Sequence, residues 1–236
     1  MEHSMYDTLL QLPLFQGLCK DDFTTIIEKV KFHFLSYKEN EIICKQGDPC
    51  KQLVFLLSGE ITLKVTDEEE GYTLSETLHA PHIIEPYSLF GMDTRYTATY
   101  LAKTDATLLT INKAYVNTEL HNYEIFRINY LNILSNRIQV SHKKLWSNHM
   151  SSLNEKFIHF LLNRCQKPQG EKVLHTTMED LARMVSETRI NVSKMLNDMQ
   201  QQGLVQLKRK EIHIPDHYYR RQGVAECSTG HLQPNL

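Results

Sequence analysis

The polar side chains with the most ordered spacing lie between Thr177 and Ile214. Apolar residues recur at helical spacing after Thr188, at Val192, Met195, Leu196 and Met199, so they mark the buried face of a helix over 189–202. The opposite face then carries Ile190, Ser193, Lys194 and Asn197. Arg189 lies in the first turn, where its guanidinium can donate two parallel hydrogen bonds to guanine O6 and N7. The pattern therefore favours reading of base edges in the major groove.

The segments on both sides of this helix supply groups suited to phosphate oxygens. Thr177 begins a shorter helix with Leu181, Ala182 and Val185 on its apolar face, and Gly203 is placed to end the second helix. Two short strands follow, with Lys208, Arg209 and Lys210 at their turn, which completes a winged helix-turn-helix. We expect contacts to double-stranded DNA from Thr177, Ser186, Thr188, Arg189, Ile190, Asn191, Ser193, Lys194, Lys208, Arg209 and Lys210. The alternative for any one of these residues is a helix cap or a solvated face.

The first half of the chain reads as short strands. Residues 60–65 alternate polar and apolar, the polar turn 68–71 follows, and 72–78 supplies a partner strand. The apolar run 53–57 is bracketed by Gly47-Asp48 and Ser58-Gly59, as turns bracket a buried strand. Strands at this spacing predict a small antiparallel barrel or jelly roll.

A long helix is predicted between these two regions, because no Gly or Pro occurs between Asn112 and Lys167. Its apolar seam is broken only by Ser141, and such a seam favours a second copy of the chain as partner; the alternative is packing on the chain's own β-domain. Ser152 and Glu155 have capping-box spacing, which predicts a new helix and a hinge there. The seam residues are Leu131, Leu134, Ile138, Ser141 and Leu145.

Composition excludes several classes of protein. The N-terminus lacks a signal peptide and no apolar run could span a bilayer, so we expect a cytoplasmic protein that is not attached to a membrane. The five cysteines are scattered, and neither they nor the twelve histidines have metal-ligand spacing. Nucleotide-binding and hydrolase motifs are missing, so we expect no enzyme, no cofactor and no metal.

Charge is divided unevenly along the chain, although the net charge is only −2. Residues 151–221 contain 12 Lys and Arg against 8 Asp and Glu, whereas residues 1–150 contain 14 against 19. The asymmetry favours an anion-binding C-terminal domain on a more acidic body.

The chain resembles the family of the cyclic-AMP receptor protein and the fumarate-nitrate regulator over nearly its whole length, to about Asp216. The resemblance implies an α+β fold: an N-terminal antiparallel β-roll like a cyclic-nucleotide-binding domain, a long dimerisation helix and a C-terminal winged helix-turn-helix. It also implies a homodimer on a pseudo-palindromic site, with RNA polymerase as a further partner. The similar segments are 45–48, 57–61, 136–141, 179–182 and 188–194.

Two departures from the family pattern have consequences for function. On the recognition helix, the family's best-known member has Arg, Glu and then a basic residue; Arg189 and Lys194 match, but Ile190 replaces the Glu. An apolar side chain there suits a thymine methyl rather than cytosine N4, so we expect a different half-site. In the sensor, Glu85 matches the family's ribose ligand, but Ile84 replaces its Gly partner.

The phosphate ligand of the family's nucleotide pocket is also replaced, because Tyr96 stands at the arginine position, before Thr97. A phosphodiester buried without a guanidinium would be uncompensated, at a cost of several kcal/mol. We therefore expect no gating by cyclic AMP, and an iron–sulfur sensor is disfavoured by the missing N-terminal cysteine cluster. A pocket for an unknown effector would contain Glu85, Tyr96, Thr97, Ser141 and His142, although the last two could instead fix helix register.

The predicted domains are a β-roll over 1–118, a helix and hinge over 119–150, the winged helix-turn-helix over 151–216 and a disordered tail over 217–236. A competing function is a ligand-sensing β-roll, for a cyclic nucleotide or another small effector, that acts through protein partners. In that case the winged helix would contact protein, which the Arg, Lys and hydroxyl pattern on the second helix argues against.

Overall fold

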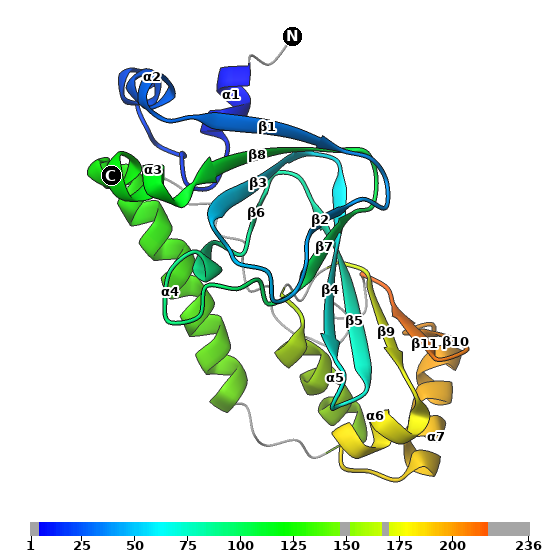
Figure 1. Ribbon diagram of the computed structural model, residues 1–236. Coiled ribbons are helices and arrows are strands. Elements are labelled where there is room, and N and C mark those ends of the chain that lie inside the picture. The colour runs from blue at the N-terminus through cyan, green and yellow to red at the C-terminus, as the bar shows by residue number, and fades with distance from the viewer. Residues whose placement is uncertain (1–4, 147–151, 167–169, 217–236) are drawn as a thin grey trace. The chain divides into compact units, whose positions relative to one another are not determined.

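The computed structural model describes residues 5–146, 152–166 and 170–216 (Figure 1). They form two compact units: the first contains 5–65 and 77–146, and the second contains 66–76, 152–166 and 170–216. The predicted tail over 217–236 and the predicted hinge before Ser152 lie outside the described residues.

The first unit is the predicted antiparallel β-roll. One sheet has the order β1-β8-β3-β6, and the strands of a second sheet in this unit follow the order β5-β4-β7-β2. The elements are α1 (Met5–Leu10), α2 (Lys20–Lys29), β1 (Phe32–Tyr37), β2 (Ile42–Cys44), β3 (Gln52–Ser58), β4 (Glu60–Asp67), β5 (Tyr72–His79), β6 (His82–Ile84), η1 (Pro86–Ser88), β7 (Thr99–Ala102) and β8 (Ala106–Asn112).

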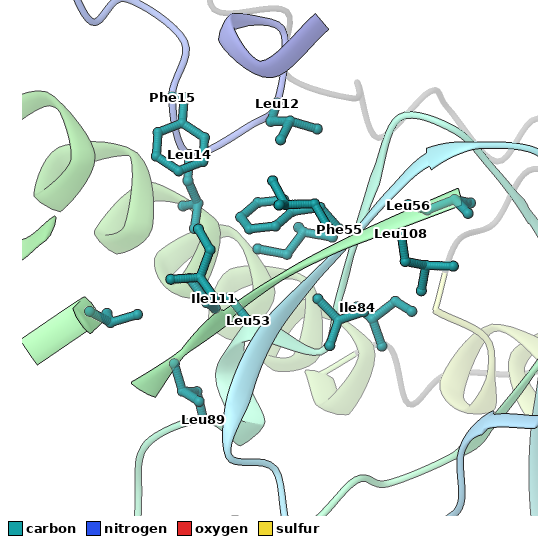
Figure 2. Packing of buried hydrophobic residues seen from close by; sticks show 14 of the residues in the cluster. Leu12, Leu14, Phe15, Leu53, Phe55, Leu56, Ile84, Leu89, Leu108 and Ile111 are labelled. Atoms are coloured by element: carbon teal, nitrogen blue, oxygen red, sulfur yellow. The ribbon is translucent and has the colours of Figure 1, made fainter. Parts of the chain in front are cut away.

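The apolar run 53–57 lies in β3 as predicted, and its residues 53–56 are buried. Figure 2 shows Leu53 and Phe55 packed with Leu108 and Ile111 of β8, beneath Phe15 of the N-terminal segment. The turn at Gly59 has a φ of +88°, and a Cβ there would lie 2.4 Å from the Asp105 carbonyl oxygen, so only glycine fits. These contacts hold the roll in one arrangement.

The helical region after β8 differs in part from the prediction, because it is not one continuous helix. Helix α3 (Lys113–Thr118) and the 3₁₀ turn η2 (Leu120–Asn122) precede the long helix α4 (Glu124–Trp146). One side of α4 packs on its own unit: Phe126 is buried, the Asn129 amide donates to the Gln16 carbonyl at 2.8 Å, and the Tyr130 hydroxyl donates to the Pro86 carbonyl at 2.5 Å. The break before Glu124 lets the chain turn onto this packed side.

The second unit contains the predicted helix-turn-helix and wing. Ser152 caps its first helix through a full capping box with Glu155, as predicted. Its apolar core includes Phe157, Leu181, Val192 and Leu196. The elements are α5 (Leu153–Arg164), β9 (Lys172–Thr176), α6 (Met178–Met184), α7 (Arg189–Gln201), β10 (Gln206–Lys208) and β11 (Glu211–Ile214).

A strand that the sequence assigned to the β-roll also belongs to this unit. Residues Tyr72–Glu76 of β5 pair antiparallel with β9, so the sheet of the second unit has the order β10-β11-β9-β5. Leu74 lies opposite Leu174, and Glu76 lies opposite Lys172. The aromatic ring of Tyr72 and the Leu74 side chain join the apolar core of the second unit.

Candidate nucleic-acid interface

Helix α7 presents the face that the sequence predicted. Val192, Met195, Leu196 and Met199 are buried, whereas the Ile190 side chain is 80% exposed. Arg189, Ile190, Ser193, Lys194, Asn197 and Asp198 line one open hollow of about 500 Å³. The exposed Ile190 side chain thus lies in the same hollow as the cations Arg189 and Lys194, and an apolar side chain can contact a thymine methyl group in the major groove.

The predicted hydroxyl residues lie at the ends of the two helices. The Thr177 side chain accepts from the Asp180 amide at 3.1 Å, and the Thr188 side chain accepts from the Asn191 amide at 3.2 Å, so both are N-caps. Ser186 lies between the helices with a positive φ of 53° and is exposed. The Asn191 amide nitrogen lies 3.4 Å from Glu187 Oε2. Capping fixes the direction of each helix, and Ser186 and Ser193 keep hydroxyls at the surface.

The wing places its cations at one end of the second unit. Lys208 ends β10 and pairs with Glu211 in the ladder, while Arg209 and Lys210 form the turn, with a φ of 60° at Lys210. Lys208 and Lys210 line a hollow of about 220 Å³ together with Thr177, Glu179 and Arg189. The structure thus brings Thr177, Arg189 and two wing lysines to one concave surface.

Acidic groups also lie at this surface, although none of them is among the predicted DNA-contacting residues. Glu179 Oε1 lies 3.2 Å from Arg189 Nη1. Glu211 accepts from His213 at 3.0 Å, and this hydrogen bond is the main reason that the pKa of Glu211 is lowered. Glu179 and Asp180 lie in the first turn of α6, and their position along the chain does not by itself indicate that Glu179 meets Arg189.

The exposed side of α4 carries apolar residues that the β-roll does not cover. Ile128 is 44% exposed, Leu131 is 61% exposed and Ile138 is 68% exposed, whereas Leu134 is half-buried. One side of α4 therefore packs on its own unit, and the other side is apolar and exposed; pairing of the exposed side with a second copy of the chain stays a prediction. The side chain of Leu145 lies outside the described residues.

The predicted effector pocket is brought together only in part. Glu85 is 1% exposed, and its carboxylate oxygens accept from Ser88 Oγ at 2.8 Å, the Thr97 amide at 2.8 Å, Thr97 Oγ1 at 2.9 Å and the Tyr100 hydroxyl at 3.1 Å. Four donors from the protein itself therefore satisfy the group that the family resemblance assigns to a ribose. Ser141 and His142 are exposed on α4.

Tyr96, at the position of the family's arginine, is buried, and burial raises the pKa of its hydroxyl strongly. Burial likewise raises the pKa of the nearby Cys44 thiol to about 12. Tyr96, Cys44, Lys51 and Thr110 line a cavity of about 320 Å³, and no arginine is among its described lining residues. The described lining of this cavity thus contains one lysine, Lys51, but lacks the arginine of the family pattern.

Metal-binding clusters and membrane-spanning helices are both absent from residues 5–146, 152–166 and 170–216. No group of three or more metal-binding side chains occurs in them. None of their helices combines the length and apolar character that a membrane crossing requires.

Comparison with known proteins assigns both units. Residues 34–123 match the cyclic nucleotide-binding domain family, and residues 155–218 match the Crp-like helix-turn-helix domain family. The cAMP-activated global transcriptional regulator Vfr of Pseudomonas aeruginosa is 21% identical over 186 residues, which cover 75% of this chain and 87% of Vfr. The fold is similar to that of the Thermus thermophilus catabolite activator protein, with a TM-score of 0.52 at 19% identity, covering 89% of this chain and 97% of that protein.

Proposed function

The chain belongs to the Crp/Fnr family of DNA-binding transcription regulators, which are not enzymes, and we propose that it binds a pseudo-palindromic DNA site as a homodimer without requiring a cyclic nucleotide. The observation that carries the proposal is the exposed face of α7, where Arg189, Ile190 and Lys194 line one hollow on a capped, well-packed helix. Acting on transcription in this way implies RNA polymerase as a further partner and the cytoplasm as the site of action.

Direct readout by Arg189 is tested by selection of duplexes from a random pool, followed by binding titrations with the Arg189→Ala variant. Loss of one bidentate guanine contact is expected to cost about 1–3 kcal/mol, all of it at one base pair of each half-site. Arg209→Ala on the wing is the matched control, because loss of a phosphate contact weakens binding to all sequences alike. Unchanged discrimination in Arg189→Ala would contradict this placement of α7.

Dimerisation is supported by the exposed apolar side of α4. Among the side chains of α4 that the structure describes, the three most exposed apolar ones belong to Ile128, Leu131 and Ile138. They are spaced by three and seven positions and so lie along one stripe. A second copy of the same helix buries such a stripe symmetrically and places two winged helices on one DNA site.

Independence of cyclic nucleotides is supported by the hydrogen bonds that the Glu85 carboxylate already accepts from the protein. A ribose hydroxyl would have to displace donors that already occupy both carboxylate oxygens. The phosphate of the nucleotide would in addition lack the guanidinium that Tyr96 replaces. The relative Vfr is described as cAMP-activated, so the two proteins would differ in their dependence on cyclic AMP.

A regulator that acts through protein partners is the second candidate function. The same selection experiment distinguishes the two, because a chain that uses its wing for protein contacts would enrich no duplex. The Arg189, Ser193 and Lys194 pattern favours DNA, since cations and hydroxyls in this order match phosphates and base edges.

A further inference from the structure

Arg189, the principal base-reading residue of the proposed function, is not alone at the surface. Its Nη1 lies 3.2 Å from Oε1 of Glu179, and the two side chains are 69% and 63% exposed. The partners come from different helices, since Glu179 lies in the first turn of α6 and Arg189 begins α7. The ion pair therefore spans the two helices at the surface where DNA would dock.

The surroundings of this pair give Arg189 two competing targets. Glu179 and Arg189 line the same hollow as Lys208 and Lys210, which are placed to bind a phosphate. Arg189 also lines the hollow along α7 with Ile190 and Ser193, and the proposed function places this second hollow against the bases. A flexible arginine between these hollows could bind a backbone phosphate of any sequence instead of a guanine.

We propose that Glu179 is a positioning residue that keeps the Arg189 guanidinium directed at a base and away from the phosphates. A guanidinium has five N–H donors in a rigid fork, so one edge can remain on Glu179 while another donates to guanine O6 and N7. The carboxylate repels phosphates from the same place and neutralises the charge that would attract them. The inference rests on the proposed function, because it assigns Glu179 a part in sequence reading.

This role depends on Ile190, which stands where the family's best-known member has a Glu. The exposed first-turn residues of α7 are Arg189, Ile190 and Asn191, and none of them has a carboxylate that could hold the guanidinium. Glu179 supplies that group from the neighbouring helix.

The test is binding of Glu179→Gln to the selected duplex and to duplexes altered at the base pair that Arg189 reads. An exposed ion pair of this kind is worth up to about fivefold in an equilibrium constant, so discrimination at that base pair is expected to fall about two- to fivefold. Binding to unrelated duplexes should become tighter, with a log–log salt slope steeper by about one, because Arg189 gains a phosphate contact. In an Arg189→Ala background, Glu179→Gln should leave discrimination unchanged.

Glu171→Gln is the matched control, because it removes one exposed carboxylate from the same unit at a residue that lines neither hollow. It should change the affinity for all duplexes alike without altering discrimination. The inference is overturned if Glu179→Gln behaves like Glu171→Gln, or if its effect on discrimination persists without Arg189. Absence of any sequence preference in the unaltered protein would instead contradict the proposed function itself.

Discussion

Replacing Glu76 with glutamine is expected to destabilise the C-terminal unit by about 3–5 kcal/mol, because it removes a carboxylate that pairs with the buried Lys172 ammonium. The two side chains are 2% and 0% exposed, and Lys172 Nζ lies 3.9 Å from Glu76 Oε2. The Gln166 amide donates to Glu76 Oε1 at 2.6 Å, and Lys172 Nζ donates to the Gly170 carbonyl at 3.0 Å. Glutamine retains an acceptor for Gln166, so the substitution removes mainly charge.

Companion variants separate the charge from the packing. Lys172→Met with Glu76→Gln removes both charges and should restore most of the lost stability, because a neutral pair needs no compensation. Glu171→Gln is the control: it removes an exposed carboxylate next to Lys172 and should stay within about 0.5 kcal/mol of the unaltered protein. In a unit of this size each kcal/mol shifts the melting temperature by about 4–8 °C.

Calorimetry of the full chain, with hydrogen exchange of β5 and β9, gives the readout. Glu76→Gln should lower the melting temperature of the C-terminal unit by more than about 10 °C, by the same relation, and should speed exchange in both strands. A melting temperature within about 2 °C of the unaltered protein would show that water reaches Lys172 and would refute the reasoning.

The deficit of the Glu76→Gln variant should also depend on pH. Burial is the main cause that lowers the pKa of Lys172 from its ordinary value of 10.5, and the charge of Glu76 opposes this shift. Between the lowered pKa and 10.5 the unfolded chain binds more protons than the folded chain, so stability rises with pH across that window. Loss of Glu76 lowers the pKa of Lys172 further, so the pH range over which stability rises begins at a lower pH. The loss of stability caused by Glu76→Gln should therefore become smaller as the pH is raised.

Three other outcomes are expected. Leu134→Glu with Ile138→Glu should give monomers with very weak binding to a full site; a dimer in light scattering would place the interface elsewhere. Cyclic AMP at millimolar concentration should change neither the melting temperature nor DNA affinity, whereas binding at 100 times Kd would add about 2.7 kcal/mol; a saturable thermal shift would contradict this. Ser152→Ala should cost about 0.5–2 kcal/mol in denaturant unfolding, since it removes the cap that accepts from the Glu155 amide at 3.2 Å; an unchanged midpoint would mean that α5 does not depend on this cap.

Local signals predicted α5, α6, α7, the two wing strands and three strands of the β-roll, and with them much of the candidate interface. The caps Ser152, Thr177 and Thr188 act within three residues along the chain, so their spacing alone locates three helix starts. The buried and exposed faces of α7 follow from the helical period in the same way. The start of α4 could not be predicted from the sequence. No Gly or Pro marks the break before Glu124, and the helix after it is positioned by packing against η1 and the N-terminal segment.

The hydrogen-bond partners of Glu85 could not be predicted from the sequence. A family pattern indicated a ligand for ribose, yet its partners Ser88, Thr97 and Tyr100 are donors whose direction depends on the folded roll. The same limit applies to Glu179, since nothing in the spacing of residues 179 and 189 indicates that their side chains meet.

The pairing of β5 with β9 could not be predicted from local sequence patterns, because the two strands lie far apart along the chain. Almost a hundred residues separate the strands. Ser75 and Glu76 are polar and lie on opposite faces of β5, so sequence alone predicts an exposed strand, although both residues are buried. Glu76 is compatible with burial because Lys172 lies directly opposite it and the Gln166 backbone amide donates to it, whereas each charge taken alone predicts exposure. A fragment that begins near Ser152 would keep Lys172 and lose Glu76, Tyr72 and Leu74 together. The recognition helix therefore depends for its stability on a strand encoded within the β-roll, and changes in the β4–β5 hairpin should alter DNA binding without any contact to DNA.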